Sequence, residues 1–371
     1  MQSSGMNRIY KPDSVLNVCL VAPFPPPYGG IANWAAMISD HYSKHPELRV
    51  EIARINTAPP ARDLDGRTIF TRVIHGARSV FSSRKELKAL IESGNVDVVH
   101  VTTSGSLALI RDCILLKLCM RKSVKSVLHI RFGRVPDVIK DNGLEKKLLM
   151  CAMRAANKVL VLDSKTEEAC LEENVIADSI PNPVNINEIQ QGVEKVGDSV
   201  VYLGWVIKAK GIEELLAAWE LVKTSKRAMQ ATLTIIGPFD EAYMEYLKSR
   251  YSFAGVRIEG ELSHVDALEI LSRSKIFVFP SYTEGFPNAV VEAMASKCAI
   301  IATDVGAIGD MLRDKCGIIV ERNPENIANA LIELLENDDL SQTLADHARL
   351  KAYKMYDLRR VGKLYAEYWG S

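Results

Sequence analysis

Two glutamates lie on either side of a predicted helix start in the stretch "SYTEGFPNAVVEAMASKCAIIATDVGA", residues 281–307. Glu284 follows an apolar strand, and Glu292 lies about one turn inside a helix of Ala, Val and Met. Pro287 suits the first turn, because its missing N–H costs nothing there. Acids near a helix N-terminus can simply stabilise the helix dipole. A carboxylate among apolar residues also needs hydrogen-bond donors, so the stretch predicts either helix stabilisation or a ligand site.

Two further loops have residues suited to an anion. Gly29 and Gly30 open a helix after the first strand, in "APFPPPYGGIANW", so their backbone amides can approach a ligand closely. Lys210 stands before Gly211 and the next helix, in "YLGWVIKAKGIEELL". A lysine is unfavourable at the positive end of a helix unless an anion lies between them. A plain strand-to-helix turn and a solvated loop lysine are the alternative interpretations.

Short apolar runs alternate with longer amphipathic runs along the whole chain. Near-continuous hydrophobicity over four to eight residues is typical of parallel strands that are covered on both faces. The alternation of such strands with helices predicts a doubly wound α/β protein. We expect strands at 15–22, 96–101, 126–130, 158–162, 199–204, 231–237, 275–279 and 298–303. In the second half we expect helices that begin near Gly211, Asp240, His264 and Asn288.

The length of 371 residues favours two domains. The polar, proline-containing segment 180–198, "IPNPVNINEIQQGVEKVGD", is typical of a linker. We therefore expect Rossmann-like domains at 1–180 and 181–356, and a C-terminal helix at 357–371 that packs back on the first domain. Two such domains would face each other across a cleft at the carboxyl ends of their strands.

Charge and cysteine content limit the class of protein. The 46 basic and 46 acidic residues give no net charge, so no overall field favours nucleic acid as a partner. Residues 1–180 hold 25 Lys and Arg against 19 Asp and Glu, a net +6, and the remainder holds 21 against 27, a net −6. Seven widely spaced cysteines without a C-x-x-C pair favour a reducing compartment and argue against a zinc site. With no apolar leader or membrane-length run, we expect a cytoplasmic protein.

The segment "EGFPNAVVE" matches the E-x₇-E signature of retaining glycosyltransferases of the GT-B fold, and the chain resembles family 4 of these enzymes. Other markers occur in the expected order along most of the chain. They are the Gly29-Gly30 loop, His129 after a strand, "IPNPVN" near the linker, and Gly204 with Lys210-Gly211.

This resemblance implies roles for the marked residues. Glu292 resembles the acid that accepts both ribose hydroxyls of a nucleotide, and Glu284 the acid that contacts the transferred sugar. Lys210 resembles the clamp on the diphosphate, and His129 the first-domain histidine near the reactive carbon of the sugar. His129, Glu284 and Lys210 are thus the candidate catalytic residues. The further donor-binding candidates are Gly29, Gly30, Gly204, Gly285, Phe286, Asn288, Ala289 and Glu292, with backbone amides at the helix start meeting the sugar and diphosphate.

The chain departs from the family at one position and imitates a metal motif at another. The family usually has arginine after its glycine, where this chain has Trp205 after Gly204. A second cation on the diphosphate is therefore missing, unless Lys208 supplies it, and lysine and arginine are not equivalent at such sites. The "DLD" at 63–65 imitates a D-x-D motif, but it lies in a polar loop rather than after a strand. We expect no metal or other cofactor.

The resemblance implies transfer of a hexose or N-acetylhexosamine, with retention, from a nucleotide diphosphate sugar to a saccharide or lipid-linked saccharide. Such a reaction belongs to the synthesis of a surface polysaccharide such as O-antigen, capsule or exopolysaccharide. One alternative is a sugar-nucleotide epimerase of the same fold, and another is a non-catalytic partner subunit.

The first domain also has a candidate membrane-docking segment at 111–125. It joins an apolar run to a basic end, and its cations are Arg111, Lys117, Arg121, Lys122 and Lys125. Such a segment can hold a protein peripherally on the inner face of an anionic membrane. The alternative is a core helix with a solvated basic end.

Overall fold

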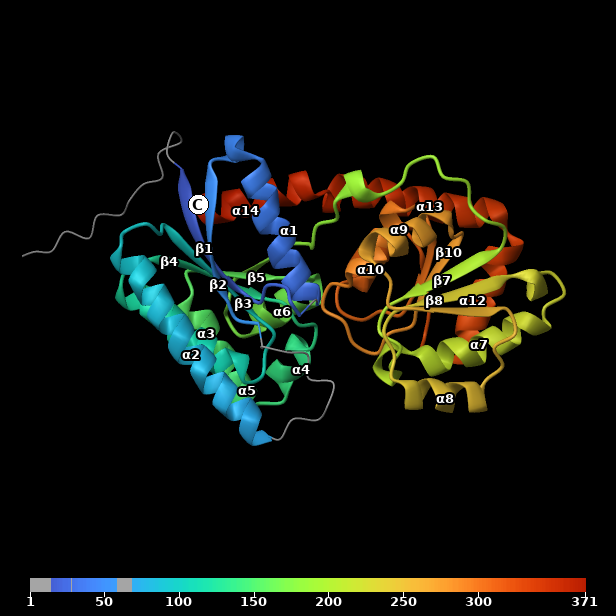
Figure 1. Cartoon of the computed structure of the whole chain (residues 1–371), viewed down its shortest axis with the longest axis horizontal. Coiled ribbons are helices and arrows are strands. Elements are labelled where there is room, and N and C mark those ends of the chain that lie inside the picture. The colour runs from blue at the N-terminus through green and yellow to red at the C-terminus, as the bar shows by residue number, and fades with distance from the viewer. Residues whose placement is uncertain (1–14, 28, 59–68) are drawn as a thin grey trace, which may run out of the picture.

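The computed structural model describes residues 15–27, 29–58 and 69–371. It forms two α/β halves side by side, each built on a parallel sheet between helices (Figure 1). The candidate D-x-D motif at 63–65 lies outside the described residues. The doubly wound α/β architecture expected from the sequence is confirmed.

The first half has the strand order β2-β1-β3-β4-β5-β6. Buried side chains cover both faces of this sheet, so it divides its core in two: α2, α3 and α5 pack on one face, and α1 and the C-terminal helix on the other. Its strands are β1 (Leu16–Ala22), β2 (Val50–Asn56), β3 (Val98–Thr103), β4 (Lys125–Ile130), β5 (Lys158–Val161) and β6 (Ala177–Ser179). Its helices are α1 (Gly30–Lys44), α2 (Ile69–Glu92), α3 (Ala108–Arg121), α4 (Val135–Lys140), α5 (Leu144–Ala155) and α6 (Ser164–Glu172).

The second half has the strand order β12-β11-β10-β7-β8-β9. The order reverses between β7 and β10, and loops that follow strands at such a switch point commonly bind ligands. Its strands are β7 (Ser199–Leu203), β8 (Thr232–Ile236), β9 (Val256–Gly260), β10 (Ile276–Phe279), β11 (Ala299–Ala302) and β12 (Ile318–Ile319). Its helices are α7 (Ile212–Thr224), α8 (Glu241–Arg250), α9 (His264–Arg273), α10 (Asn288–Ala295), α11 (Ile308–Leu312), α12 (Pro324–Glu336) and α13 (Asp338–Lys351).

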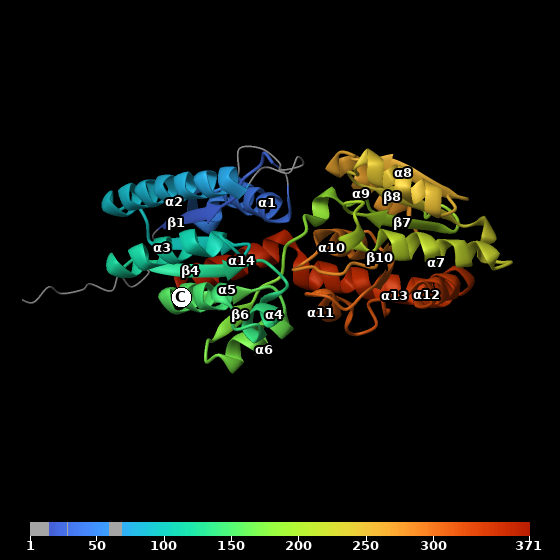
Figure 2. The same cartoon turned by 90° about the horizontal axis from the view of Figure 1, so that it is seen from below.

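The last helix, α14 (Leu358–Gly370), returns to the first half and packs beside α1 (Figure 2). Tyr365 and Trp369 are buried there, and the Tyr42 hydroxyl donates to the carbonyl of Gly362 at 2.5 Å. Val184 of the linker pairs with Asp357 in an isolated bridge, where the chain crosses back. Two chain segments therefore join the halves, side by side.

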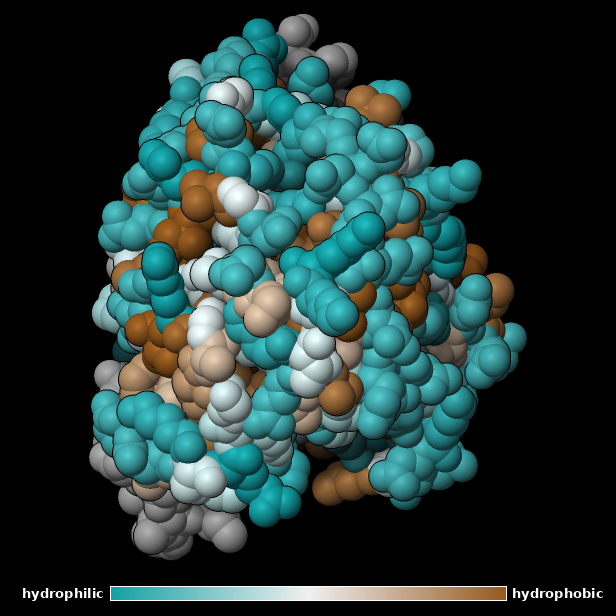
Figure 3. Space-filling model, turned by 90° about the vertical axis from the view of Figure 1, so that its right-hand side faces the viewer, coloured by the Kyte–Doolittle hydropathy of each residue, from teal (hydrophilic) through white to brown (hydrophobic). Residues whose placement is uncertain are grey.

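The outer face of the second half is largely hydrophilic, with apolar side chains in small separate patches (Figure 3). Among the described helices, none has both the length and the hydropathy that crossing a bilayer requires.

Candidate active site

The loops after β7 and β10 are joined at the switch point of the second sheet. Gly211 has φ +72°, and a Cβ there would lie 2.0 Å from the carbonyl oxygen of Pro280, so only glycine fits this contact. The amide of Tyr282 donates to the carbonyl of Ala209 at 3.0 Å. The sequence motifs around Lys210 and Glu284 are therefore brought together, although 74 residues separate them.

The first half reaches the same place through the loop after β4. A Cβ on Gly133 would lie 1.4 Å from the carbonyl oxygen of Glu284, so glycine is required at this close approach. From the other side, the amide of Ala307 donates to the carbonyl of Gly285 at 2.8 Å. Strand ends of both sheets thus meet around Glu284 and Gly285.

Helix α10 presents an N-terminus without a side-chain cap at this meeting point. Its N-cap is Pro287, which provides no side-chain cap. The amides of Gly285, Phe286, Asn288 and Ala289 donate no hydrogen bond within the part of the chain that the structure describes. Free amides at the positive end of a helix form an anion-binding arrangement.

Glu284 and Lys210 form an ion pair, with 2.5 Å between Nζ and Oε1. The Glu284 side chain is 11% exposed and also accepts from the Ser281 hydroxyl at 2.8 Å. Lys210 is therefore held by a carboxylate, and its ammonium lies at the loop that leads into α10. An incoming anion would share this cation with Glu284.

Glu292 lies within α10 and is 14% exposed. Its Oε1 lies 3.0 Å from Nε2 of His264, the first residue of α9. The hydrogen bond to Glu292 raises the pKa of His264, and the charges of Glu292 and Glu188 add to this, although partial burial opposes it. The second carboxylate oxygen of Glu292 has no partner among the described residues, so it is free for hydroxyl donors.

The glycine candidates lie in two places, the start of α1 and the end of β7. Gly29 is the extended N-cap of α1, and a Cβ on Gly29 or Gly30 would meet nothing within 4 Å, so their surroundings are open. Gly204 follows β7, where a Cβ would lie 3.1 Å from the Tyr202 hydroxyl and 3.3 Å from Phe279. Gly29 and Gly30 thus have open surroundings, whereas Gly204 is packed against aromatic side chains, and the donor-binding role of all three stays a prediction.

The cations near Gly204 differ from the family pattern. Trp205, where the family has arginine, is 40% exposed. Lys208 is exposed and has no ion-pair partner among the described residues. Of the two loop lysines, only Lys210 is oriented by a carboxylate.

His129, the histidine expected near the reactive carbon of the sugar, lies inside β4. Its side chain is fully buried in the first half, with its ring 5.4 Å from that of Trp34 and 5.3 Å from that of His100. Burial lowers the pKa of His129 well below its ordinary value, and the charge of Arg131 lowers it further. His129 is next to the last residue of β4, and its proposed contact with the sugar stays a prediction.

Arg131, which the sequence analysis did not single out, takes the first position past β4. It is 7% exposed, and its guanidinium lies 4.0 Å from the centre of the Trp34 ring. Its Nη2 donates to Oδ1 of Asn182 at 2.6 Å. Asn182, part of the "IPNPVN" marker, donates from Nδ2 to Oδ1 of Asn288 at 2.9 Å and to the carbonyl of Phe286 at 3.2 Å. The only sequence signal for Arg131 was its place directly after an apolar strand.

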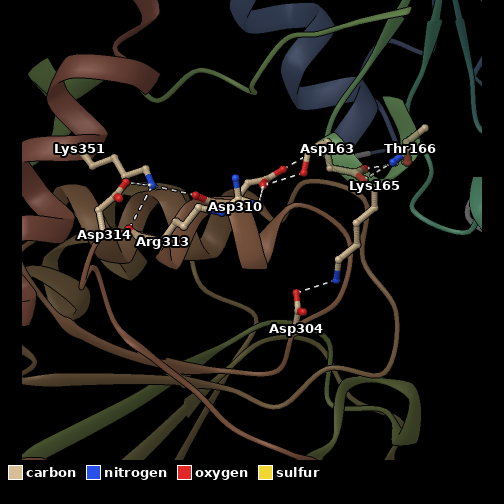
Figure 4. A network of polar contacts seen from close by, with 9 residues as sticks. Asp163, Lys165, Thr166, Asp304, Asp310, Arg313, Asp314 and Lys351 are labelled. Carbon is tan, nitrogen blue, oxygen red and sulfur yellow. Dashed lines mark hydrogen bonds and ion pairs between the residues drawn. The ribbon is translucent and has the colours of Figure 1, made fainter. Parts of the chain in front are cut away.

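A second set of contacts holds the halves together next to the site (Figure 4). Ser164 donates from its amide and its hydroxyl to the carboxylate of Asp310, both at 2.8 Å. Lys165 pairs with Asp304 at 2.8 Å, and Lys351 donates to the carbonyl of Asp310 at 2.8 Å. Ser164 and Lys165, in the first turn of α6, thereby join the first half to Asp310 of α11 and to Asp304 in the loop before it, whereas the Lys351 contact lies within the second half.

The described residues contain no group of three or more His, Cys, Asp or Glu side chains placed to hold a metal ion. The carboxylates of the site, Glu284 and Glu292, are engaged with Lys210 and His264 rather than with each other. The arrangement can bind an anion at α10 and polyol hydroxyls at its carboxylates.

Comparison with solved structures identifies the fold. Sucrose-phosphate synthase from Thermosynechococcus elongatus superposes with a TM-score of 0.73 at 18% identity, over 95% of this chain and 98% of that one. The HepE protein of Anabaena, solved in complex with UDP, gives a TM-score of 0.70 at 14% identity, over 95% and 99%. The two Rossmann-like halves therefore form a GT-B fold, as expected from the sequence.

Sequence comparison places the second half in a family. Residues 197–337 match the family model of Glycosyl transferases group 1. The capsular polysaccharide biosynthesis glycosyltransferase CapM of Staphylococcus aureus is 27% identical over 213 residues, which cover 56% of this chain and about half, 53%, of that relative. This GT-B protein therefore carries a group 1 glycosyltransferase domain.

Proposed function

We propose that the protein transfers a hexose or N-acetylhexosamine, with retention, from a nucleotide diphosphate sugar to a saccharide acceptor. The observation that carries this proposal is the uncapped N-terminus of α10 between Glu284 and Glu292, at the point where strand ends of both halves meet. Amides and a lysine suit a diphosphate, and partly buried carboxylates suit the hydroxyls of ribose and sugar.

Each part of the donor has a proposed partner. Glu292 accepts the ribose hydroxyls, which displace or share its contact with His264. The amides of Asn288 and Ala289 face the diphosphate, and Lys210 adds a charge-assisted contact. Glu284 accepts from a sugar hydroxyl while it keeps Lys210 in place.

The chemistry follows from charge that develops on the leaving group. As the bond from the anomeric carbon to the diphosphate oxygen breaks, negative charge grows on the diphosphate, where Lys210 and the α10 amides are already aimed. The acceptor oxygen bonds to the anomeric carbon from the same face of the sugar that the diphosphate leaves, which gives retention, and the acceptor proton passes to the departing diphosphate oxygen. His129 is buried and neutral, so it has no part in this proton transfer.

Solved and curated relatives support the choice of substrates. HepE is solved with UDP and with UDP-glucose, and CapM is a capsular polysaccharide biosynthesis protein. We accordingly propose synthesis of a surface polysaccharide as the role of this chain. The acceptor binds to the first domain, residues 1–180 with the returning helix 357–371, because the donor occupies the second domain, residues 181–356.

A basic groove on the first half supports peripheral membrane association at the cytoplasmic face. Lys117, Lys147 and Arg154 line it, between α3 and α5, and have no ion-pair partner among the described residues. Of the cations in the predicted docking segment, Arg111, Lys122 and Lys125 are engaged with neighbouring groups. We therefore propose that this groove, rather than the whole segment, faces anionic lipid.

The test is binding and turnover with a panel of nucleotide diphosphate sugars. A true donor at 100 times its Kd should stabilise the folded protein by about 2.7 kcal/mol in thermal denaturation. Glu292→Ala should abolish most of this shift, and Glu325→Ala, at the exposed first turn of α12, is the matched control. Absence of a shift with every donor, or equal shifts in both variants, would contradict the proposed site.

A further inference from the structure

The hydrogen bonds from Arg131 to Asn182 to Asn288 run from the first half, through the linker, to the N-terminus of α10. The three contacts measure 2.6 Å from Nη2 to Oδ1 of Asn182, 2.9 Å from its Nδ2 to Oδ1 of Asn288, and 3.2 Å from the same Nδ2 to the carbonyl of Phe286. Asn182 is 4% exposed, so no solvent competes for these bonds.

The guanidinium fixes the direction of every bond in this series. Arginine has donors and no acceptor, so the group of Asn182 that faces it must be the oxygen. The NH₂ of Asn182 then points to Asn288 and to a carbonyl that can only accept. Asn288 must turn its own oxygen to Asn182, which leaves its NH₂ at the N-terminus of α10, without a partner among the described residues.

The charge of Arg131 is buried, which is unfavourable for the stability of the fold. It is 7% exposed and no carboxylate lies within 4 Å of it among the described residues. Burial lowers its pKa to about 10, so it remains charged near neutral pH. Its Nε has no hydrogen-bond partner, its Nη1 lies 3.4 Å from Nε2 of His129, and Trp34 adds a cation–π contact. A buried cation without a counter-ion destabilises a fold, so stability alone does not account for it.

We infer that Arg131 and Asn182 are positioning residues that orient the side-chain NH₂ of Asn288 toward the diphosphate of the donor. This inference rests on the proposed function and adds a side-chain donor to the anion site. Without the contact to Asn182, the side chain of Asn288 could present either its oxygen or its NH₂ to a ligand. With Arg131 charged, Asn288 presents hydrogen-bond donors and not its oxygen, which would repel phosphate.

Asn182→Asp reverses the polarity while it keeps the shape. A carboxylate at position 182 still accepts from Arg131, but it cannot donate to Asn288. Asn288 then gives its NH₂ to position 182 and presents its oxygen to the ligand. The change supplies the missing counter-charge of Arg131 but sets a carboxylate oxygen beside the carbonyl of Phe286, so thermal unfolding is measured on the same variant. Loss of diphosphate binding in a variant that unfolds near the wild-type temperature shows that the change acts at the site and not through unfolding.

The experiment compares a nucleoside diphosphate with its nucleoside by calorimetry, using whichever of UDP, dTDP, GDP and ADP binds wild type most tightly. Asn182→Asp should weaken the diphosphate about tenfold, the loss of one contact to a charged group, and leave nucleoside affinity unchanged. Asn187→Asp makes the same change at an exposed position of the linker and serves as the matched control.

Arg131→Met and Asn288→Ala should each weaken the diphosphate by a similar factor, and the double variant should lose no more than Asn288→Ala alone. Arg131→Lys, which also only donates, should recover most of the affinity. Unchanged diphosphate affinity in Asn182→Asp would overturn the inference, as would an equal loss for nucleoside and diphosphate. If wild type binds none of the four diphosphates, the proposed function fails, and this inference fails with it. If wild type binds a diphosphate and Asn182→Asp binds it equally well, only this inference is refuted.

Discussion

Replacing Lys210 with alanine should lower kcat/KM for the donor sugar by about a hundredfold. A contact to a charged group contributes roughly 1.5–3 kcal/mol, and about 1.4 kcal/mol corresponds to a factor of ten. The lost contact alone therefore predicts roughly a tenfold to hundredfold decrease. The structure places the effect at the upper end, because Glu284, 11% exposed, would keep only the Ser281 hydroxyl as its partner. Its unpaired charge would then repel the diphosphate.

Lys208 is the matched control for this prediction. It lies two residues away in the same loop, is exposed, and has no ion pair among the described residues. Lys208→Ala should therefore change kcat/KM by less than about threefold, as is usual for an exposed charge. Steady-state kinetics on both variants with the true donor decide the comparison. A silent Lys210→Ala together with a severe Lys208→Ala would show that the diphosphate clamp is Lys208.

A double-mutant cycle separates two ways in which Lys210 can act. If Lys210 contacts the diphosphate, its removal should still cost about tenfold when Glu284 has been changed to glutamine. If it serves only to hold Glu284, the second substitution should have almost no effect in the Glu284→Gln background. That second result would refute the assignment of Lys210 to the diphosphate.

Three further outcomes follow from the charges of the molecule. Transfer should survive EDTA, because the amides of α10 and Lys210 meet the diphosphate; complete loss that Mn²⁺ restores would contradict this. Because Glu292 raises the pKa of His264 above 6.5, their pair contributes its full stability below pH 6.5 and loses it as the pH rises through the raised pKa. Between about pH 5.5 and about pH 8.5, the thermal unfolding temperature of wild type should therefore fall more than that of His264→Asn. Parallel curves for the two proteins would argue against the pair. Wild type should float with anionic liposomes at low salt, because each unpaired cation contributes about 1 kcal/mol to binding. The triple variant Lys117→Glu, Lys147→Glu, Arg154→Glu should not float, and equal flotation of the two proteins would contradict the proposed role of the groove.

The interior strands of both sheets could be predicted from the sequence, and the edge strands could not. All eight expected strands overlap strands of the structure, and the four that were missed are β2, β6, β9 and β12, which lie at the sheet edges. Interior strands are covered on both faces and are therefore continuously apolar. Edge strands such as β9, with alternating intermediate and exposed residues, lack this signal. Short β6 and β12, of three and two residues, depend on their neighbours for pairing.

The second-half part of the site was visible in the sequence, because its residues are local to one helix start. Glu284, Asn288 and Glu292 lie within nine positions, so periodicity and turn residues suffice to place them. Contacts across the domain interface carry no such signal. The sequence pointed to His129, whereas the strand register places Arg131 two residues nearer the carboxyl edge on the same face.

Asn182 shows the same limit from the linker side. Its segment was recognised as polar and irregular, but its side chain is buried by residues more than 100 positions away in the chain. Burial of that kind is decided by how the halves dock, and docking depends on close contacts such as the one between Gly133 and Glu284. Neither the composition nor the residue spacing of segment 180–198 indicates that Asn182 is buried.

The central claim is that a nucleotide diphosphate sugar binds at the N-terminus of α10, and a crystal structure of the protein with the best-binding nucleoside diphosphate tests it most directly. The account predicts ribose hydroxyls within hydrogen-bond distance of Glu292, and diphosphate oxygens at the amides of Asn288 and Ala289 with Lys210 beside them. A nucleotide bound elsewhere, such as in the basic groove between α3 and α5, with α10 unoccupied, would contradict it.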